Sequence, residues 1–102
     1  MGKKRPERSA RRAAARAARD LVHEREKLFG LGPGARIERP IEVATSAVIE
    51  IKARATPCPQ CEGTLQLVDH QAEPGGVRRV ELRCVRCGAP RTLYFRIVPQ
   101  GN

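Results

Sequence analysis

Four cysteines, arranged as two Cys-x-x-Cys pairs, constrain the fold of this chain more than any other feature of its sequence. The pairs are Cys58 with Cys61 and Cys84 with Cys87, and 22 residues separate them. A tight turn places both thiolates of such a pair on one side, and two turns together complete a closed tetrahedral shell for zinc. Because a chain of 102 residues buries only a modest apolar core, a metal would add needed stability. We therefore expect one structural Zn²⁺ bound by all four cysteines.

Other uses of four cysteines fit the sequence less well. Disulfides form in oxidising compartments, and the N-terminal segment MGKKRPERSARRAAARAARD lacks the apolar run of an export signal. A thioredoxin-like redox site has one pair beside a helix in an alternating α/β chain, whereas strands and turns are expected around these pairs. An iron–sulfur cluster is chemically possible with four thiolates but usually has other spacings. No segment approaches membrane-spanning length, so we expect a cytoplasmic protein with no membrane partner.

Positive charge is concentrated at the N-terminal end of the chain. The formal net charge is +9, and residues 1–19 contain eight Lys or Arg residues against the single acid Glu7. Residues 1–29 are expected to form a basic amphipathic helix, since Pro6 suits a first turn and Gly30 suits a stop. At about 100° per residue, one arc of this helix is apolar and the opposite arc is basic. The apolar arc contains Ala10, Ala13, Ala14, Ala17, Leu21 and Leu28, and the basic arc contains Arg8, Arg12, Arg16 and Arg19.

The apolar arc of the helix is thin because most of it is alanine, so its burial gains little free energy. We expect the part before Asp20 to pack weakly or to lie in solvent. Contact with the rest of the protein is expected at Leu21, Val22, Leu28 and Phe29.

The remainder of the chain is expected to be β-structure. Residues 30–40, GLGPGARIERP, form a flexible linker by composition. Residues 41–55 alternate imperfectly and predict a leading strand with Ile49, Ile51 and Ala53 on one face. Three further strands are marked by Leu65 and Leu67, by Val80, Leu82 and Cys84, and by Leu93, Phe95 and Ile97, with a turn at EPGG. We expect the leading strand and a cysteine-bearing sheet to fill residues 41–98, with a tail over residues 99–102.

Residues 57–97, which begin with CPQCEG and include CVRCGAP, resemble a zinc ribbon with two rubredoxin-type knuckles joined by a β-hairpin. The resemblance implies a structural metal and a small antiparallel sheet, with Cys58, Cys61, Cys84 and Cys87 as ligands. The expected fold class is therefore α+β, an N-terminal basic helix followed by a small antiparallel β zinc ribbon. Zinc ribbons occur in transcription factors, polymerase subunits, ribosomal proteins and many small bacterial proteins, so the motif indicates a fold and not a function. Elongation-factor ribbons have an acidic pair at the hairpin tip, and the tip DHQAEPGGVRR has no adjacent acidic pair.

The sequence does not favour an enzyme. Four protein ligands leave zinc no open position for an activated water, and no separate nucleophile with a base and an orienting group is evident. His70 is expected as an exposed residue near the hairpin tip. We therefore expect neither a catalytic residue nor a small-molecule substrate.

The basic arc of the helix is the strongest candidate for function. Arg8, Arg12, Arg16 and Arg19 can follow a phosphate backbone, and Arg79 with Arg83 predicts a second basic patch on the sheet face opposite the core. The predicted partner is nucleic acid, DNA or RNA, or a nucleoprotein complex. The alternative is a protein-interaction module that docks on a partner through the ribbon or the helix. Metal trafficking, a third possibility, would require loosely held zinc and reactive thiolates.

Overall fold

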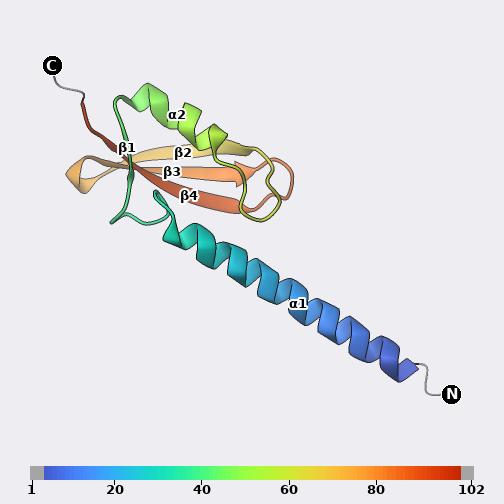
Figure 1. Ribbon diagram of the computed structural model, residues 1–102. Helices are drawn as coiled ribbons and strands as arrows, with labels where there is room; N and C mark the ends of the chain where they lie inside the picture. Colours follow the sequence, from blue (N-terminus) through green and yellow to red (C-terminus); the bar gives the residue numbers. More distant parts are fainter. Residues whose placement is uncertain (1–3, 100–102) are drawn as a thin grey trace.

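The computed structural model describes the backbone of residues 4–99 and the side chains of residues 7–99 (Figure 1). In chain order the elements are α1 (Lys4–Leu31), β1 (Ile41–Val43), α2 (Ser46–Ala55), β2 (Leu65–Glu73), the short 3-10 helix η1 (Pro74–Gly76), β3 (Val77–Cys84) and β4 (Pro90–Ile97). The fold is α+β, with an N-terminal helix followed by a small four-stranded sheet, as the sequence predicts. Residues 1–3 of the predicted helix and residues 100–102 of the predicted tail lie outside the described part.

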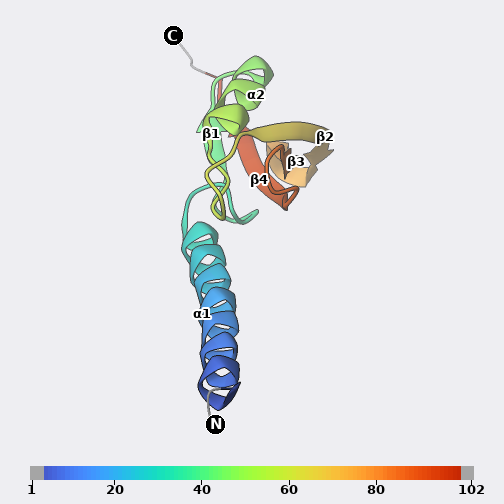
Figure 2. The same cartoon turned by 90° about the vertical axis from the view of Figure 1, so that its right-hand side faces the viewer.

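The sheet has the strand order β1-β4-β3-β2 (Figures 1 and 2). β2 pairs with β3 and β3 with β4 in antiparallel fashion, whereas β1 pairs with β4 in parallel, with Ile41 opposite Phe95. The strands of residues 57–97 are thus antiparallel, as expected, and the parallel pairing of β1 is a feature that the sequence did not predict. The preceding segment positions β1, because Gly34, at a φ of 83°, accepts a hydrogen bond from the Tyr94 N–H at 2.7 Å. Residues 30–40, predicted as a linker, are thus hydrogen-bonded to the sheet.

Residues 46–55 form helix α2, not the strand predicted from their alternation. Ile49 and Ala53, four residues apart, are buried at 1% and 0% exposure, whereas Ile51, predicted on the same face, is 69% exposed. A spacing of four residues places side chains on one helix face, so packing against the sheet selects the helix. The β-branched residues favour a strand locally, and tertiary packing overrides that preference. The predicted leading strand is reduced to Ile41–Val43.

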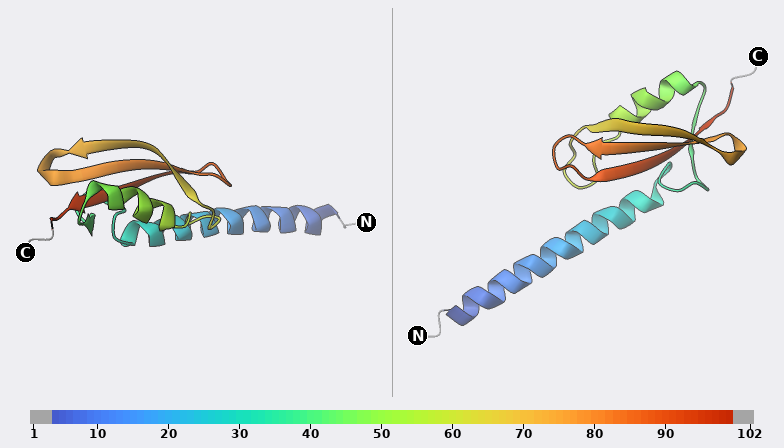
Figure 3. Two further views of the ribbon diagram at one scale, coloured as in Figure 1. Left: turned by 90° about the horizontal axis from the view of Figure 1, so that it is seen from above. Right: turned by 180° about the vertical axis from the view of Figure 1, so that it is seen from behind.

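The core lies between α2 and one face of the sheet, as the edge-on view in Figure 2 and the left view in Figure 3 show. Its buried members come from α2 and all four strands, together with a cysteine that follows α2. They are Val43, Ile49, Ala53, Cys58, Leu65, Val80, Leu82, Cys84, Leu93 and Phe95. The predicted inward positions of β3 and the predicted inward Leu93 and Phe95 of β4 are thereby confirmed.

A β-bulge in β2 changes which of its side chains face the core. The pairing register shifts between Leu67 and Asp69, so that His70 lies opposite Val80 of β3. His70 is half-buried within β2, and the prediction of an exposed turn residue is wrong. The bulge inserts one residue, which reverses the alternation beyond it.

Helix α1 projects from the compact part of the molecule (Figures 1 and 3). The principal extents are 77 × 24 × 21 Å, and residues 7–25 are exposed along their whole length. We refer to residues 7–21 of α1 as the arm. None of the described helices combines the length and the apolar composition needed to cross a membrane.

The face by which α1 contacts the rest of the protein differs from the predicted one. Phe29 packs against the core as expected, but Leu21, Val22 and Leu28 are 49%, 50% and 68% exposed. The side chains that turn toward the sheet are Phe29 and the charged Glu26, and they lie on a different arc from Leu21 and Leu28. A polar contact thus decides the orientation of the helix, and its Ala/Leu arc stays in solvent.

Candidate metal centre

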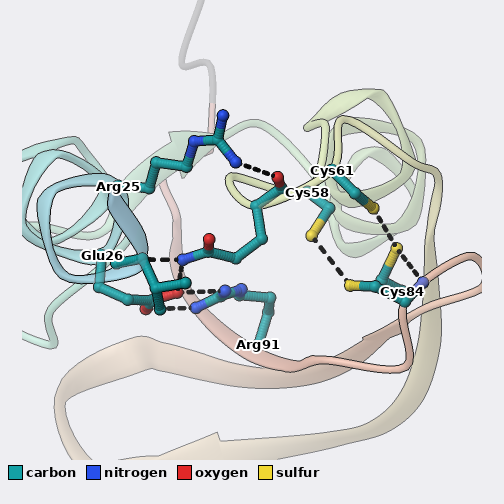
Figure 4. Close-up of polar contacts among 9 residues, drawn as sticks. Arg25, Glu26, Cys58, Cys61, Cys84 and Arg91 are labelled. Atoms are coloured by element: carbon teal, nitrogen blue, oxygen red, sulfur yellow. Dashed lines mark hydrogen bonds and ion pairs between the residues drawn. The ribbon is translucent and has the colours of Figure 1, made fainter. Parts of the chain in front are cut away.

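The four cysteines come from two loops that the fold brings together. Cys58 and Cys61 lie between α2 and β2, Cys84 ends β3, and Cys87 lies in the turn before β4. Their four Sγ atoms all lie within 4.8 Å of one another, with 3.7 Å between Cys58 and Cys87 and 3.3 Å between Cys61 and Cys84 (Figure 4). Cys58 and Cys84 are buried, Cys61 is half-buried and Cys87 is exposed. The structure thus gathers all the sequence-predicted ligands at one place.

The sulfur positions fit a tetrahedral metal ion. With a zinc–sulfur bond of about 2.3 Å, tetrahedral geometry places two ligand sulfurs about 3.8 Å apart. The observed 3.3 Å and 3.7 Å separations, and the 4.8 Å limit, lie around that value. Four thiolate-forming side chains suit soft or borderline metals and not calcium or magnesium. The cluster could therefore bind one metal ion through four sulfurs.

The two loops share one backbone conformation. In the first cysteine loop, residues 58–63, the Glu62 N–H donates to the Cys58 carbonyl at 2.8 Å and the Cys58 N–H donates to the Gly63 carbonyl at 2.9 Å. In the second cysteine loop, residues 84–89, the Gly88 N–H donates to the Cys84 carbonyl and the Cys84 N–H donates to the Ala89 carbonyl, both at 3.0 Å. The same geometry therefore presents each cysteine pair to the centre.

In each loop, the residue directly after the cysteine pair has a left-handed backbone conformation. Gly88 has a φ of 76°, and the equivalent Glu62 has a φ of 63°. Left-handed backbone is easy for glycine and strained for glutamate. Gly63 matters for the space it leaves, because a Cβ there would lie 2.9 Å from Cys84 Sγ and 3.2 Å from Cys61 Sγ.

Backbone N–H groups point at the sulfurs and favour their charged form. Burial raises the pKa of the Cys58 thiol, but the N–H groups of Gln60 and Cys61 outweigh it, so the pKa is lowered overall. In the second loop the N–H of Cys87, assisted by that of Arg86 and opposed by burial, lowers the pKa of Cys84 to about 6. These two N–H groups lie 3.4 Å from Cys84 Sγ. Such bonds stabilise thiolates, the form that binds metal.

Crowding of the thiols acts in the opposite direction on Cys61. The N–H of Gly63 lowers the pKa of Cys61, yet the adjacent Cys84 and burial raise it overall to about 11. Two negative charges at 3.3 Å repel, so one thiol keeps its proton when its neighbour ionises. A bound cation removes this conflict, because it holds all the thiolates at once.

The first cysteine loop also carries the polar contact with α1. The Gln60 side chain donates to the Val22 carbonyl at 3.2 Å and to the Glu26 carboxylate at 2.7 Å, and Arg25 donates to the Gln60 carbonyl at 2.7 Å. Glu26 also accepts two hydrogen bonds from the Arg91 guanidinium (Figure 4). The Arg91 side chain is 9% exposed and its guanidinium lies 5.4 Å from the Phe29 ring centre. The sequence does not indicate a role for Gln60, Glu26 or Arg91, since nothing in their spacing links residues so far apart.

The predicted nucleic-acid residues fall into two separate groups. Arg8, Arg12, Arg16 and Arg19 are all exposed on the arm. Arg79 and Arg83 lie on β3, on the sheet face opposite the core, and the pairing brings Asp69, Glu73 and Glu81 to the same face. Arg79 pairs with Glu73 at 3.4 Å and donates to Gln71 at 2.8 Å, whereas Arg83 is exposed. The sheet face therefore carries mixed charge, and the arm carries a net positive charge, with five arginines against Glu7 and Asp20.

Searches of protein-family models, curated proteins and solved structures found no match to this chain.

Proposed function

We propose that the four cysteines bind one structural Zn²⁺ and that residues 57–97 form a zinc ribbon. Support comes from the repeated loop conformation, the N–H groups directed at the sulfurs and the tetrahedral spacing of the Sγ atoms. Four protein ligands fill the coordination shell, so the metal stabilises the fold and does not activate water. The protein has no catalytic role in this proposal. It acts in the cytoplasm, where cysteines remain reduced and free to bind metal.

The zinc ribbon carries a basic arm that binds nucleic acid, and one observation above all supports this role. Arg8, Arg12, Arg16 and Arg19 lie on one arc of a projecting helix, and every residue from 7 to 25 is exposed. The described structure gives none of these four arginines an ion pair. A rod with unpaired guanidinium groups can approach a duplex or a single strand without rearranging the body of the protein.

The expected contacts are to phosphates and not to base edges. Guanidinium groups bind phosphate oxygens in bidentate fashion, and such contacts position a protein without reading sequence. Arg83 could add a contact from the sheet, whereas Arg79 would first have to leave Glu73 and Gln71. The arm therefore accounts for most of the affinity, with weak sequence discrimination.

Binding of the zinc-loaded full chain to duplex DNA, single-stranded DNA and RNA across a salt series tests this proposal. Each phosphate contact adds about 0.9 to the slope of log affinity against log salt for duplex DNA. Replacing Arg8, Arg12, Arg16 and Arg19 by glutamine should therefore lower the slope by about 3 to 4. A matched control removes the same charge elsewhere, at Arg36, Lys52, Arg54 and Arg96, all exposed outside the arm.

The control variant distinguishes direct contacts of the arm from a general effect of the net charge of the protein. If the arm is the contact, the control keeps most of the slope and the affinity. Equal losses in both variants, or no binding by the wild type near physiological salt, would contradict the proposal.

A protein-interaction module remains the second candidate because the Ala/Leu arc of α1 is uncovered. Leu21, Leu28 and Leu31 are 49%, 68% and 59% exposed. With Ala10, Ala14 and Ala17 they follow alternating spacings of four and three residues, interrupted by Glu24, which is the pattern of a helix that packs on another helix. Sedimentation equilibrium of the wild type, L21E and the control I51E tests whether the partner is a second copy. Self-association that L21E alone abolishes would favour this function.

A further inference from the structure

Gln60 occupies a special position between the metal centre and the arm. It lies between Cys58 and Cys61 in the first cysteine loop. Its backbone carbonyl accepts from Arg25, and its side-chain amide donates to the Val22 carbonyl and to Glu26. One residue of the first cysteine loop thus contacts three residues of α1.

The remaining side-chain contacts of α1 with the rest of the described structure are few and lie near its C-terminal end. They are the ion pair of Glu26 with Arg91, the contact of Phe29 with Arg91 and the core, and the hydrogen bond from Arg39 to the Leu31 carbonyl. These contacts hold the end of the helix, whereas Gln60 reaches one turn further toward the arm, at Val22. Gln60 thus extends the attached part of α1 from residues 26–31 to residues 22–31, and a longer attached part holds the direction of a rod more firmly.

A metal fixes the conformation of the first cysteine loop because it joins that loop to Cys84 and Cys87. The loop includes the left-handed residue Glu62, at a φ of 63°, and bonds from a cation to Cys58 and Cys61 would hold the loop in this conformation. Without the metal, the position of Gln60 depends on the loop alone.

We propose that Gln60 is a positioning residue that couples metal binding at the four cysteines to the orientation of the arm. Metal holds the loop, the loop holds Gln60, and Gln60 directs α1 away from the sheet. Loss of metal frees the arm to reorient about its C-terminal attachment. This coupling rests on the proposed function, since the arm is the proposed nucleic-acid contact, and it makes presentation of that contact depend on the metal.

Thermodynamic linkage gives the coupling a second consequence. If bound metal strengthens the docking of α1, then docking of α1 must strengthen metal binding by the same factor. Residues of α1 that touch no cysteine should therefore change the affinity of the protein for metal. Outer contacts of metal loops commonly alter affinity by about ten- to a hundredfold.

Two variant pairs in the full chain test the coupling with zinc alone as the probe. Q60A removes both side-chain bonds to α1, and its control is Q66A, at an exposed glutamine of β2. R25A removes the bond from the helix side, and its control is R11A, at an exposed arginine of the same helix. Zinc affinity is measured by competition with a chromophoric chelator, and backbone mobility of α1 by ¹⁵N relaxation in the zinc-loaded proteins.

The expected result is a loss of zinc affinity of about fivefold or more in both Q60A and R25A, with faster motion of the arm relative to the sheet. In the Q60A/R25A double variant the loss should be smaller than the product of the single losses, because both act through one contact. Wild-type affinity and wild-type arm motion in Q60A and R25A, or equal losses in the controls, would overturn the proposal. Nucleic acid is absent from this experiment, so its failure is distinct from failure of the proposed function in the salt series.

Discussion

Gly63→Ala tests the packing of the metal centre directly. Gly63 is buried, and an added Cβ would lie 2.9 Å from Cys84 Sγ, 2.9 Å from Arg86 Cβ and 3.2 Å from Cys61 Sγ. A flexible side chain could move aside, but in the proposed centre the metal holds both sulfurs, and Cys84 is part of the core. Overpacking of this kind costs about 1 to 3 kcal/mol. If that cost falls on the metal-bound form, zinc affinity drops by about five- to 150-fold.

The assay for this prediction combines chelator competition with denaturant unfolding of the zinc-loaded protein. Gly30→Ala is the matched control, because nothing lies within 4 Å of the position its Cβ would take. G63A should lose both zinc affinity and free energy of unfolding, while G30A keeps its zinc affinity. If G63A binds zinc as tightly as G30A and unfolds at the same denaturant concentration, the proposed arrangement of the four sulfurs is wrong.

Three further perturbations have expected outcomes. Glu62→Gly should raise the free energy of unfolding by about 0.5 to 1 kcal/mol in denaturant titrations, because it relieves a φ of 63° and matches Gly88 in the other loop; a loss of stability would contradict this. The pKa of Glu26 is lowered mainly by its hydrogen bond with Arg91, so its carboxylate stabilises the fold above its usual pKa and loses this effect as the pH falls through the lowered value. E26Q should therefore lower the free energy of unfolding by about 1 to 2 kcal/mol, after allowance for the partial exposure of Glu26. This difference from wild type should stay constant from about pH 8 to pH 5, and a difference that varied within this range would show that the pair of Glu26 with Arg91 is not its source. Removal of metal by a chelator should abolish the cooperative unfolding transition of the sheet, as followed by circular dichroism, and an unchanged transition would show that the fold does not need the metal.

Much of the metal centre could be predicted because its evidence is local. Two pairs with identical spacing select one geometry, and the alternation around Cys84 places the end of β3 at the core. Residue identity alone therefore predicted which side chains meet. The contact of Gln60 with Glu26 could not be predicted, because it depends on the direction in which α1 leaves the sheet.

Residues 46–55 show why alternation was misleading. Val48, Ile49 and Ile51 are residue types common in strands. Ile49, Ile51 and Ala53 have the two-residue spacing of a strand face, but Ile49 and Ala53 alone also have the four-residue spacing of a helix face. Only the packing of α2 on the sheet, which leaves Ile51 69% exposed, decides between the two. The direction in which His70 faces also could not be predicted, because a single inserted residue in β2 reverses the alternation and has little signal in the sequence.

X-ray absorption spectroscopy of the zinc-loaded full chain tests the central structural claim most directly, since it reports the ligands of the metal themselves. The account predicts one zinc per chain with four sulfur ligands at about 2.3 Å and no nitrogen or oxygen ligand. A shell with fewer than four sulfurs, or with bound water, would contradict the closed structural site.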